Sequence, residues 1–167
     1  MEYLLLLIEF FWIKGIRAIL WSCAIPVTIG LLIFYKSDNT IYYQNAANFH
    51  SNLVTVLGIL IGFTISTLTM LLTVNNANIE KAKLELIGKK IFKKDISLFD
   101  SVVIGLAYII LIQGFLLIAN FIYPIFVSIA TLQGKTFFAI NISLMVHIIL
   151  ILMRNVLDFY FILTKKQ

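Results

Sequence analysis

Residues 53–74 read LVTVLGILIGFTISTLTMLLTV and contain no charged side chain. At about 1.5 Å per residue, a helix of this length covers a hydrocarbon layer about 30 Å thick. An uncharged stretch this long therefore predicts a helix that crosses a membrane.

Three more uncharged apolar stretches lie around it, at residues 18–35, 101–123 and 136–153. The chain of 167 residues is 61% hydrophobic and 13% charged, and soluble domains have about 25% charged residues. So little charge is not enough to cover a water-facing surface. We predict an all-α integral membrane protein, a single membrane domain over residues 1–167 with four transmembrane helices.

The basic residues predict the orientation. If the first span runs outward, eleven of the 13 Lys and Arg side chains lie on the cytoplasmic side, and only Lys36 and Lys135 lie outside. This bias follows the positive-inside rule. We expect a multi-pass protein of the bacterial inner (plasma) membrane with both termini in the cytoplasm.

The remaining segments are predicted as connections. Residues 3–13 are too short to span and contain Glu9, which indicates a short N-terminal interfacial helix with Trp12 at headgroup depth. Residues 36–52 form a polar outer loop in this prediction. Residues 75–97, NNANIEKAKLELIGKKIFKKDIS, predict a basic cytoplasmic helical connection that continues the second span.

The second span has small residues on one stripe, because Gly58, Gly62 and Ser66 follow one another at intervals of four. Such stripes let helix backbones approach closely in lipid. Thr69 and Thr73 add hydroxyls to the same helix. Close packing inside one four-helix subunit is the simplest interpretation, and a subunit interface or a pore-lining helix is the alternative.

The later spans contain polar side chains at membrane depth, among them Gln113, Asn141 and His147. Such groups face other helices or water, because lipid cannot satisfy them. Gln113 and His147 are both near the middle of their spans and could meet, and Ser143 shares a face with His147. Interhelical hydrogen bonds are one interpretation; a gate or a proton-sensitive point at His147 is the other.

Six lysines of the connection could attract an anion. Alternatively, these lysines only fix the orientation of the chain in the membrane and contact lipid phosphates. The sharper hypothesis is a phosphate-bearing ligand, a nucleotide or an oligonucleotide, bound beneath the membrane. The candidate ligand-binding residues are Lys81, Lys83, Lys89, Lys90, Lys93 and Lys94.

Enzyme signatures are missing from the sequence. There is one cysteine, Cys23, and the two histidines, His50 and His147, are far apart; no HExxH, GxSxG, P-loop or dinucleotide motif occurs. We predict a protein that is not an enzyme, with no catalytic residues, no metal site and no cofactor.

The short N-terminal segment, the four spans, the stretch GILIGFTISTLTMLL at residues 58–72 and the lysine-rich connection together resemble small membrane subunits of bacterial antiphage defence systems. The membrane effector of the Hailong system is the nearest likeness, and the membrane subunit of the Kiwa system is similar in layout. A Hailong-type effector implies a homo-oligomeric ion channel, a tetramer, held shut by the nucleotide product of a partner nucleotidyltransferase. Opening would depolarise the membrane and arrest growth.

A Kiwa-type role implies a non-conducting sensor or scaffold that docks a cytosolic defence partner. The sequence does not separate the two roles. A small transporter or a lysis protein also fits the hydropathy. The bilayer, further copies of the chain, an anionic nucleotide ligand and a cytosolic protein are therefore the expected partners.

Overall fold

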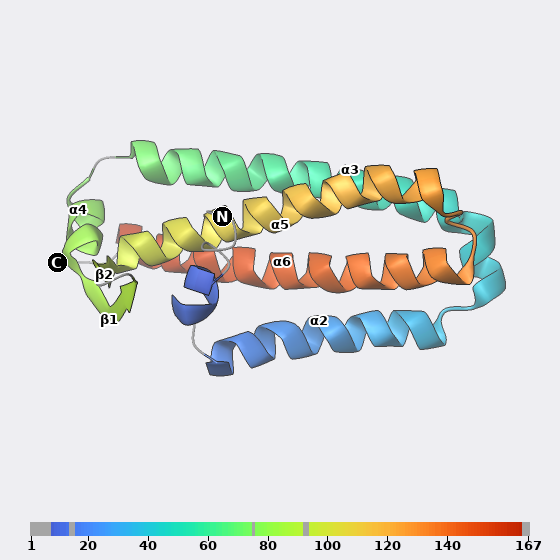
Figure 1. Ribbon diagram of the computed structural model, residues 1–167. Coiled ribbons are helices and arrows are strands. Elements are labelled where there is room, and N and C mark those ends of the chain that lie inside the picture. The colour runs from blue at the N-terminus through green and yellow to red at the C-terminus, as the bar shows by residue number, and fades with distance from the viewer. Residues whose placement is uncertain (1–7, 14–15, 75, 92–93, 165–167) are drawn as a thin grey trace.

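The computed structural model describes residues 8–13, 16–74, 76–91 and 94–164. Its long helices lie side by side and alternate in direction, as Figure 1 shows. In chain order they are α2 (Ile16–Lys36), α3 (Asn39–Thr73), α5 (Leu98–Phe126) and α6 (Leu132–Thr164). The helix α4 (Ala77–Leu84) and the strands β1 (Leu86–Ile91) and β2 (Lys94–Ser97) cap one end of the bundle.

The core follows a heptad pattern on α5 and α6. One set of the buried positions on both helices alternates at spacings of four and three residues, which is typical of the seam of a left-handed helix pair. On α5 they are Val102, Leu106, Ile109, Gln113, Leu116 and Asn120. On α6 they are Asn141, Met145, Ile148, Leu152, Asn155, Phe159 and Ile162.

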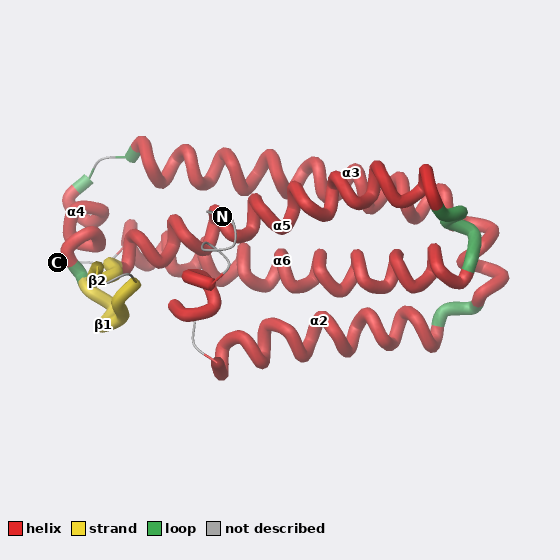
Figure 2. The backbone as a smooth tube through the Cα atoms, viewed as in Figure 1, coloured by secondary structure: helices red, strands yellow, loops and turns green. Residues whose placement is uncertain are grey.

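The helices that follow one another along the chain are not always neighbours. α3 packs on α5, α5 packs on α6, and α2 packs on α6. Figures 1 and 2 show α2 and α3 on opposite sides of the α5–α6 pair. The described packing of α2 therefore depends on α6, which comes last in the chain.

The turn between α2 and α3 is short, so the predicted polar loop at residues 36–52 is wrong. α3 begins at Asn39 because the Asp38 carboxylate caps it and accepts the backbone N–H groups of Thr40 (2.7 Å) and Ile41 (3.4 Å). These two bonds lower the pKa of Asp38 below its ordinary value of 3.8. The polar residues 39–52 are therefore helical, and they extend α3 beyond the apolar stretch that starts at Leu53.

Buried Lys135 joins this turn to the start of α6. Its Nζ donates to the carbonyl oxygen of Ser37 (2.8 Å) and to Oδ1 of Asn39 (2.6 Å). On the neighbouring connection, the Tyr42 hydroxyl donates to the carbonyl oxygen of Ile129 (3.0 Å). Hydrogen bonds therefore hold both the α2–α3 turn and the α5–α6 connection against neighbouring helices.

The connection at the other end is only partly helical, so the prediction of a helix over residues 75–97 is wrong after Leu84. α3 ends at its C-cap Val74, and α4 is followed by the antiparallel hairpin of β1 and β2. Gly88 has a φ of 71°, which other residues rarely adopt, and it lies where the strand register shifts. Ser97 and Asp100 then form a capping box that starts α5.

The described N-terminal residues 8–13 are helical and lie against the bundle. Phe10 is buried and stacks on Tyr108 of α5 with ring centroids 3.9 Å apart, and Ile13 is buried as well. Trp12 is largely exposed. An interfacial position for residues 3–13 stays a prediction, and residues 3–7 lie outside the described ones.

The helices α3, α5 and α6 are long and apolar enough to cross a membrane. α5 and α6 contain the predicted spans 101–123 and 136–153, and α3 contains the predicted span 53–74 except for its C-cap Val74. α2 is helical over the predicted span 18–35. The part of it whose side chains are described, Ser22–Lys36, is apolar but shorter than a membrane span. The structure thus supports a membrane-embedded helical protein, and a fourth span stays a prediction.

Candidate functional site

The predicted site residues lie in three separate places. Gln113, Asn141 and His147 are buried in the core. Gly58, Gly62, Ser66, Thr69 and Thr73 lie on the exposed face of α3. The described lysines of the set lie on α4 and the hairpin.

His147 is at the centre of a network that joins three helices. Its Nδ1 is 2.7 Å from the carbonyl oxygen of Ser22 on α2, and its Nε2 is 3.0 Å from the Tyr108 hydroxyl on α5. A carbonyl oxygen only accepts, so Nδ1 carries a proton and donates to Ser22. In the neutral ring Nε2 then accepts from Tyr108, whose ring stacks on Phe10.

Gln113 forms no hydrogen bond to His147 in this network, so the hydrogen-bonded pair that the sequence left possible is not formed. The Gln113 Nε2 atom donates instead to the hydroxyl of Thr64 on α3, at 3.3 Å. The Gln113 Oε1 atom is buried without a hydrogen-bond partner. The shared face of Ser143 and His147 is confirmed, because both contact α2: His147 at Ser22 and Ser143 at Gly30.

An asparagine pair joins α5 and α6 farther along the bundle. Asn120 Nδ2 donates to Asn141 Oδ1 at 2.6 Å, and each amide also bonds a carbonyl oxygen on its own helix. Asn155 is fully buried beside Gly105, near the opposite end. Interhelical hydrogen bonding is therefore the role the structure gives to Gln113, Asn120, Asn141 and His147.

The α3 stripe faces away from the rest of the chain. Gly58 and Gly62 are exposed, and a Cβ atom added at either one would meet no atom within 4 Å. The prediction that these glycines pack inside one subunit is therefore wrong. The glycines that allow close helix contacts are others: a Cβ on Gly30 would lie 3.0 Å from Ser143 Cβ, and one on Gly105 would lie 2.5 Å from Asn155 Nδ2.

Hydroxyl groups lie along the same exposed face of α3. Thr55, Ser66 and Thr73 each donate to the carbonyl oxygen four residues earlier, at 2.8 to 3.0 Å. This bond satisfies the hydroxyl hydrogen and leaves the oxygen lone pairs directed outward. The stripe itself is thus small and weakly polar, no described residue packs on its glycines, and large exposed apolar side chains of the same helix, such as Ile59 and Phe63, flank it.

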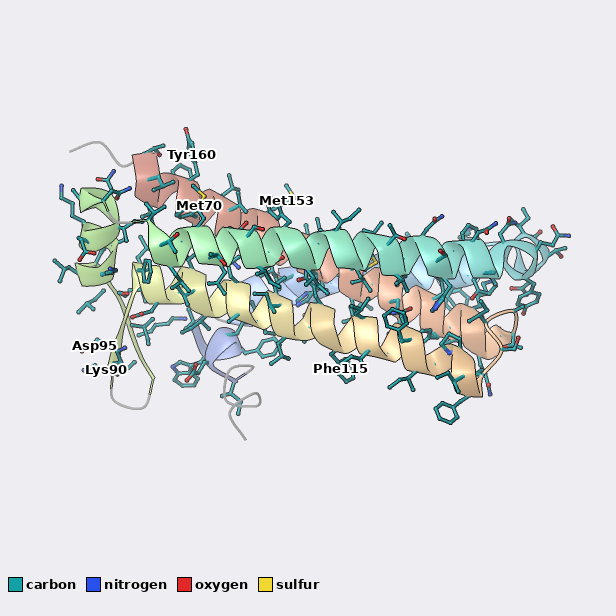
Figure 3. All side chains as sticks on the ribbon, turned by 90° about the horizontal axis from the view of Figure 1, so that it is seen from above. Met70, Lys90, Asp95, Phe115, Met153 and Tyr160 are labelled. Carbon is teal, nitrogen blue, oxygen red and sulfur yellow. The ribbon has the colours of Figure 1, made fainter. Side chains whose placement is uncertain are left out.

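The other long helices also expose large apolar side chains, which suit lipid. On α5 these are Phe115, Ile118, Phe121, Ile122, Ile125 and Phe126. Figure 3 shows Phe115 on α5, Met153 and Tyr160 on α6, and Met70 on α3, all of them exposed.

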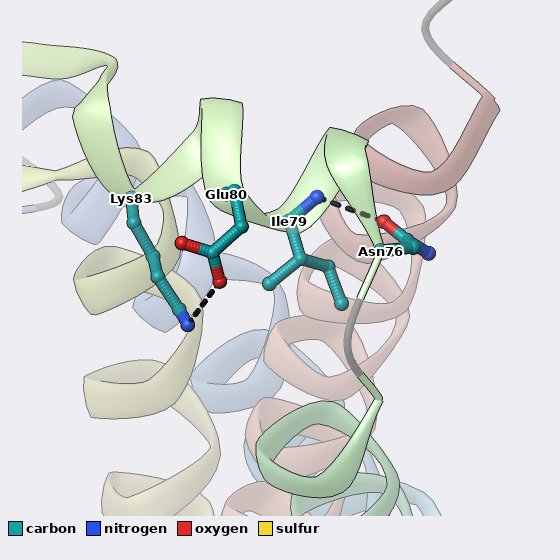
Figure 4. Close-up of polar contacts among 4 residues, drawn as sticks. All are labelled: Asn76, Ile79, Glu80 and Lys83. Atoms are coloured by element: carbon teal, nitrogen blue, oxygen red, sulfur yellow. Dashed lines mark hydrogen bonds and ion pairs between the residues drawn. The ribbon is translucent and has the colours of Figure 1, made fainter.

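The candidate anion-binding lysines do not converge on one point. Lys83 pairs with Glu80 at 2.7 Å on α4, whose N-cap Asn76 accepts the N–H of Ile79, as Figure 4 shows. Lys90 is 3.4 Å from Asp95 on the hairpin (Figure 3).

Of the other lysines, Lys89 donates to the carbonyl oxygens of Trp12 (3.0 Å) and Ile13 (2.5 Å). Lys81 and Lys94 are exposed and form no ion pair with the described residues. Lys93 lies outside the described residues. The lysine end therefore offers a diffuse positive surface, part of which holds the hairpin and the N-terminal segment in place.

The described part of the chain contains no group of three or more His, Cys, Asp or Glu side chains that could hold a metal ion. Comparisons with protein-family profiles, curated proteins and solved structures found no match to the chain.

Proposed function

We propose that the chain is one subunit of a homo-oligomeric ion channel, with four membrane spans and with the exposed face of α3 turned toward the other subunits and the conducting path. The observation that carries this proposal is the stripe of small and hydroxyl-bearing residues on α3, which nothing in the described part of the chain covers. Small residues allow close approach between helices of neighbouring copies. The outward hydroxyl oxygens suit a hydrated path for cations.

The closed core supports placing the path between subunits. Gln113 and Asn141 are 0% and 1% exposed, and His147 is 6% exposed. Their hydrogen bonds join helices of the same chain, so a hydrated path through these residues would break the packing that holds the bundle together. The proposed path therefore runs at a boundary between chains.

Control of the channel is proposed at the lysine end. α3 leads into α4 through the few residues after Val74, so a ligand that moves α4 also moves the end of the α3 face. The exposed ammonium groups of Lys81 and Lys94 suit a phosphate-bearing signal of the nucleotide type. The biological setting, depolarisation and growth arrest during phage infection, rests on the resemblance to Hailong-type effectors, which also implies a tetramer.

Two matched glycine variants test the proposal. Gly62→Leu adds bulk to the α3 face, and Gly114→Leu adds the same bulk to α5; a Cβ at either site meets nothing within 4 Å. Both should leave the subunit folded, because neither creates a clash within the chain. We expect only Gly62→Leu to abolish the oligomer in detergent and the conductance in planar bilayers.

The proposal fails if the purified wild-type chain is monomeric, or if its oligomer passes no ions with or without nucleotides. It also fails if Gly62→Leu and Gly114→Leu retain the same conductance. Expression toxicity alone does not test it, since many membrane proteins are toxic when overproduced.

The hairpin favours a second candidate function, a scaffold that docks a cytosolic partner. β1 and β2 form a sheet of only two strands, and such a sheet leaves edges that can accept another strand. Replacing Lys90 and Lys94 with Gln should then abolish partner co-purification but leave membrane insertion intact. A channel that conducts in the absence of any partner protein would exclude this role as the main one.

A further inference from the structure

A groove of about 470 Å³ lies between α2 and α6, in the half of the bundle nearer the α2–α3 turn. Its α2 side includes Gly30, Leu31 and Phe34, and its α6 side includes Thr136 and Ile140. The lining side chains are almost all apolar. The volume is within the range of about 300–1,000 Å³ that is typical of small-molecule sites.

A second cavity of about 560 Å³ opens at the α2–α3 turn, and it is polar. Lys36, Asp38 and Lys135 line it. Phe34 and Tyr35 line both this cavity and the groove, so the two spaces adjoin. Together they form one elongated site with a charged end and an apolar end.

The charged end carries a net positive charge. Lys36 and Lys135 contribute two positive charges, and Asp38 contributes one negative charge. Buried Lys135 forms its hydrogen bonds to uncharged oxygens on Ser37 and Asn39, and the described residues give it no ion pair. The Asp38 carboxylate is engaged by the N–H groups that it caps. One monoanion would balance this end of the site.

The apolar end has the length of one leaflet. From Val27 to Tyr35, and from Thr136 to Leu144, the lining residues extend over eight helical steps. At about 1.5 Å per residue this is about 12 Å. Half of a hydrocarbon core about 30 Å thick is about 15 Å. An acyl chain that starts at the charged end would therefore follow the groove toward the middle of the membrane.

The floor of the groove depends on a close approach of the two helices. A Cβ on Gly30 would lie 3.0 Å from Ser143 Cβ and 3.1 Å from the carbonyl oxygen of Ala139. Any larger residue at Gly30 would push α2 away from α6. The glycine therefore shapes the groove and brings Phe34 and Lys135 close, with the Lys135 Nζ 5.6 Å from the ring centroid.

We propose that this site binds one glycerophospholipid, with the phosphodiester at Lys36 and Lys135 and one acyl chain in the α2–α6 groove. The phosphate supplies the single negative charge that the polar cavity lacks, and charge-assisted hydrogen bonds to it are strong. The proposal does not depend on ion conduction, because it uses neither the α3 face nor the lysines of α4 and the hairpin.

Native mass spectrometry of the full chain in detergent, with added phosphatidylglycerol, tests the site. The wild type should retain one lipid per chain. Leu31→Trp fills the groove, and Leu32→Trp is its matched control: these adjacent α2 leucines are 51% and 52% exposed, but Leu32 does not line the groove. Lys36→Gln removes a charge at the site, and Arg154→Gln removes one from an exposed residue toward the other end of the bundle.

Leu31→Trp and Lys36→Gln should each lower the lipid affinity about tenfold, which corresponds to about 1.4 kcal/mol. Both controls should bind as the wild type does. Diacylglycerol with the same chains and soluble glycerol phosphate should each bind more weakly than phosphatidylglycerol. Diacylglycerol lacks the phosphate, and glycerol phosphate lacks the acyl chains.

Equal retention by Leu31→Trp and Leu32→Trp, or equal binding of diacylglycerol and phosphatidylglycerol, would overturn the proposal. So would a Leu31→Trp variant whose oligomeric state changes while its lipid binding does not. That result would mean that a second copy of the chain covers the groove.

Discussion

The hydrogen bond between Tyr108 and His147 offers a direct test of how the bundle is held together. Tyr108→Phe removes one hydroxyl and keeps the ring that stacks on Phe10 at 3.9 Å. It leaves Nε2 of a histidine that is 6% exposed without the donor 3.0 Å away. The perturbation is therefore confined to one buried polar contact.

The expected loss is about 1 kcal/mol. Leaving a buried acceptor unsatisfied costs about 1–3 kcal/mol in proteins generally. Interhelical hydrogen bonds in membranes average about 0.6 kcal/mol and reach about 1.7, because the unfolded chain in lipid also finds partners. Nδ1 of His147 keeps its bond to Ser22, so the ring stays in place and the lower part of the range applies.

Reversible unfolding in mixed micelles, followed by circular dichroism during titration with sodium dodecyl sulfate, measures this loss. A double-mutant cycle with His147→Leu isolates the coupling between the two side chains. Tyr160→Phe is the control, since Tyr160 is 57% exposed on α6. Equal stabilities of Tyr108→Phe and Tyr160→Phe, or additive effects in the cycle, would refute the reasoning.

Three further predictions concern the end of the bundle with the α2–α3 turn. A Cβ on Gly134 would fall on the carbonyl oxygen of Ile129, so Gly134→Ala should destabilise the chain by about 1–3 kcal/mol, whereas Gly114→Ala should be neutral or stabilising by up to about 1 kcal/mol. Thermal unfolding in detergent compares the two glycine variants. Lys135→Met should cost about 1–2 kcal/mol in the same assay, because a charge-assisted donor to two acceptors on the turn is lost. The pKa of Asp38 is lowered in the folded chain, so its contribution is present above its ordinary value of 3.8 and is lost as the pH falls through the folded pKa. The midpoint of Asp38→Asn, which keeps the cap, should therefore depend less on pH than the wild-type midpoint between about pH 5 and pH 2.

The apolar stretches could be located from the sequence because lipid tolerates no charge, but the ends of the helices could not. α3 extends back to Asn39 because Asp38 caps it, and hydropathy does not detect helix that continues into the polar zone. The hairpin was missed because Leu86, Ile87 and Ile91 fit a ragged helical face as well as they fit a strand. Gly88 was the available signal, since it interrupts that face and has a positive φ.

The polar core could be predicted only as a set of residues. Membrane depth identified Gln113, Asn141 and His147, but their partners depend on helix register. The spacing of four and three residues on α5 and α6 would have found Asn155 and placed Asn120 on the seam. The direction of the Gly58 stripe could not be read from the sequence either, because small residues suit internal and external contacts equally well.

The packing of α2 on α6 has a consequence for biogenesis. α2 ends at residue 36 and α6 begins at residue 132, a separation of 96 residues. At synthesis rates of about 5–20 residues per second, the described contacts of α2 form roughly 5–20 s after it leaves the ribosome. During that interval the Gly30 surface has no partner within the chain, so the insertion machinery or lipid must shield it. A nascent chain that stops before α6 would expose this surface permanently, and membrane proteases could recognise it there.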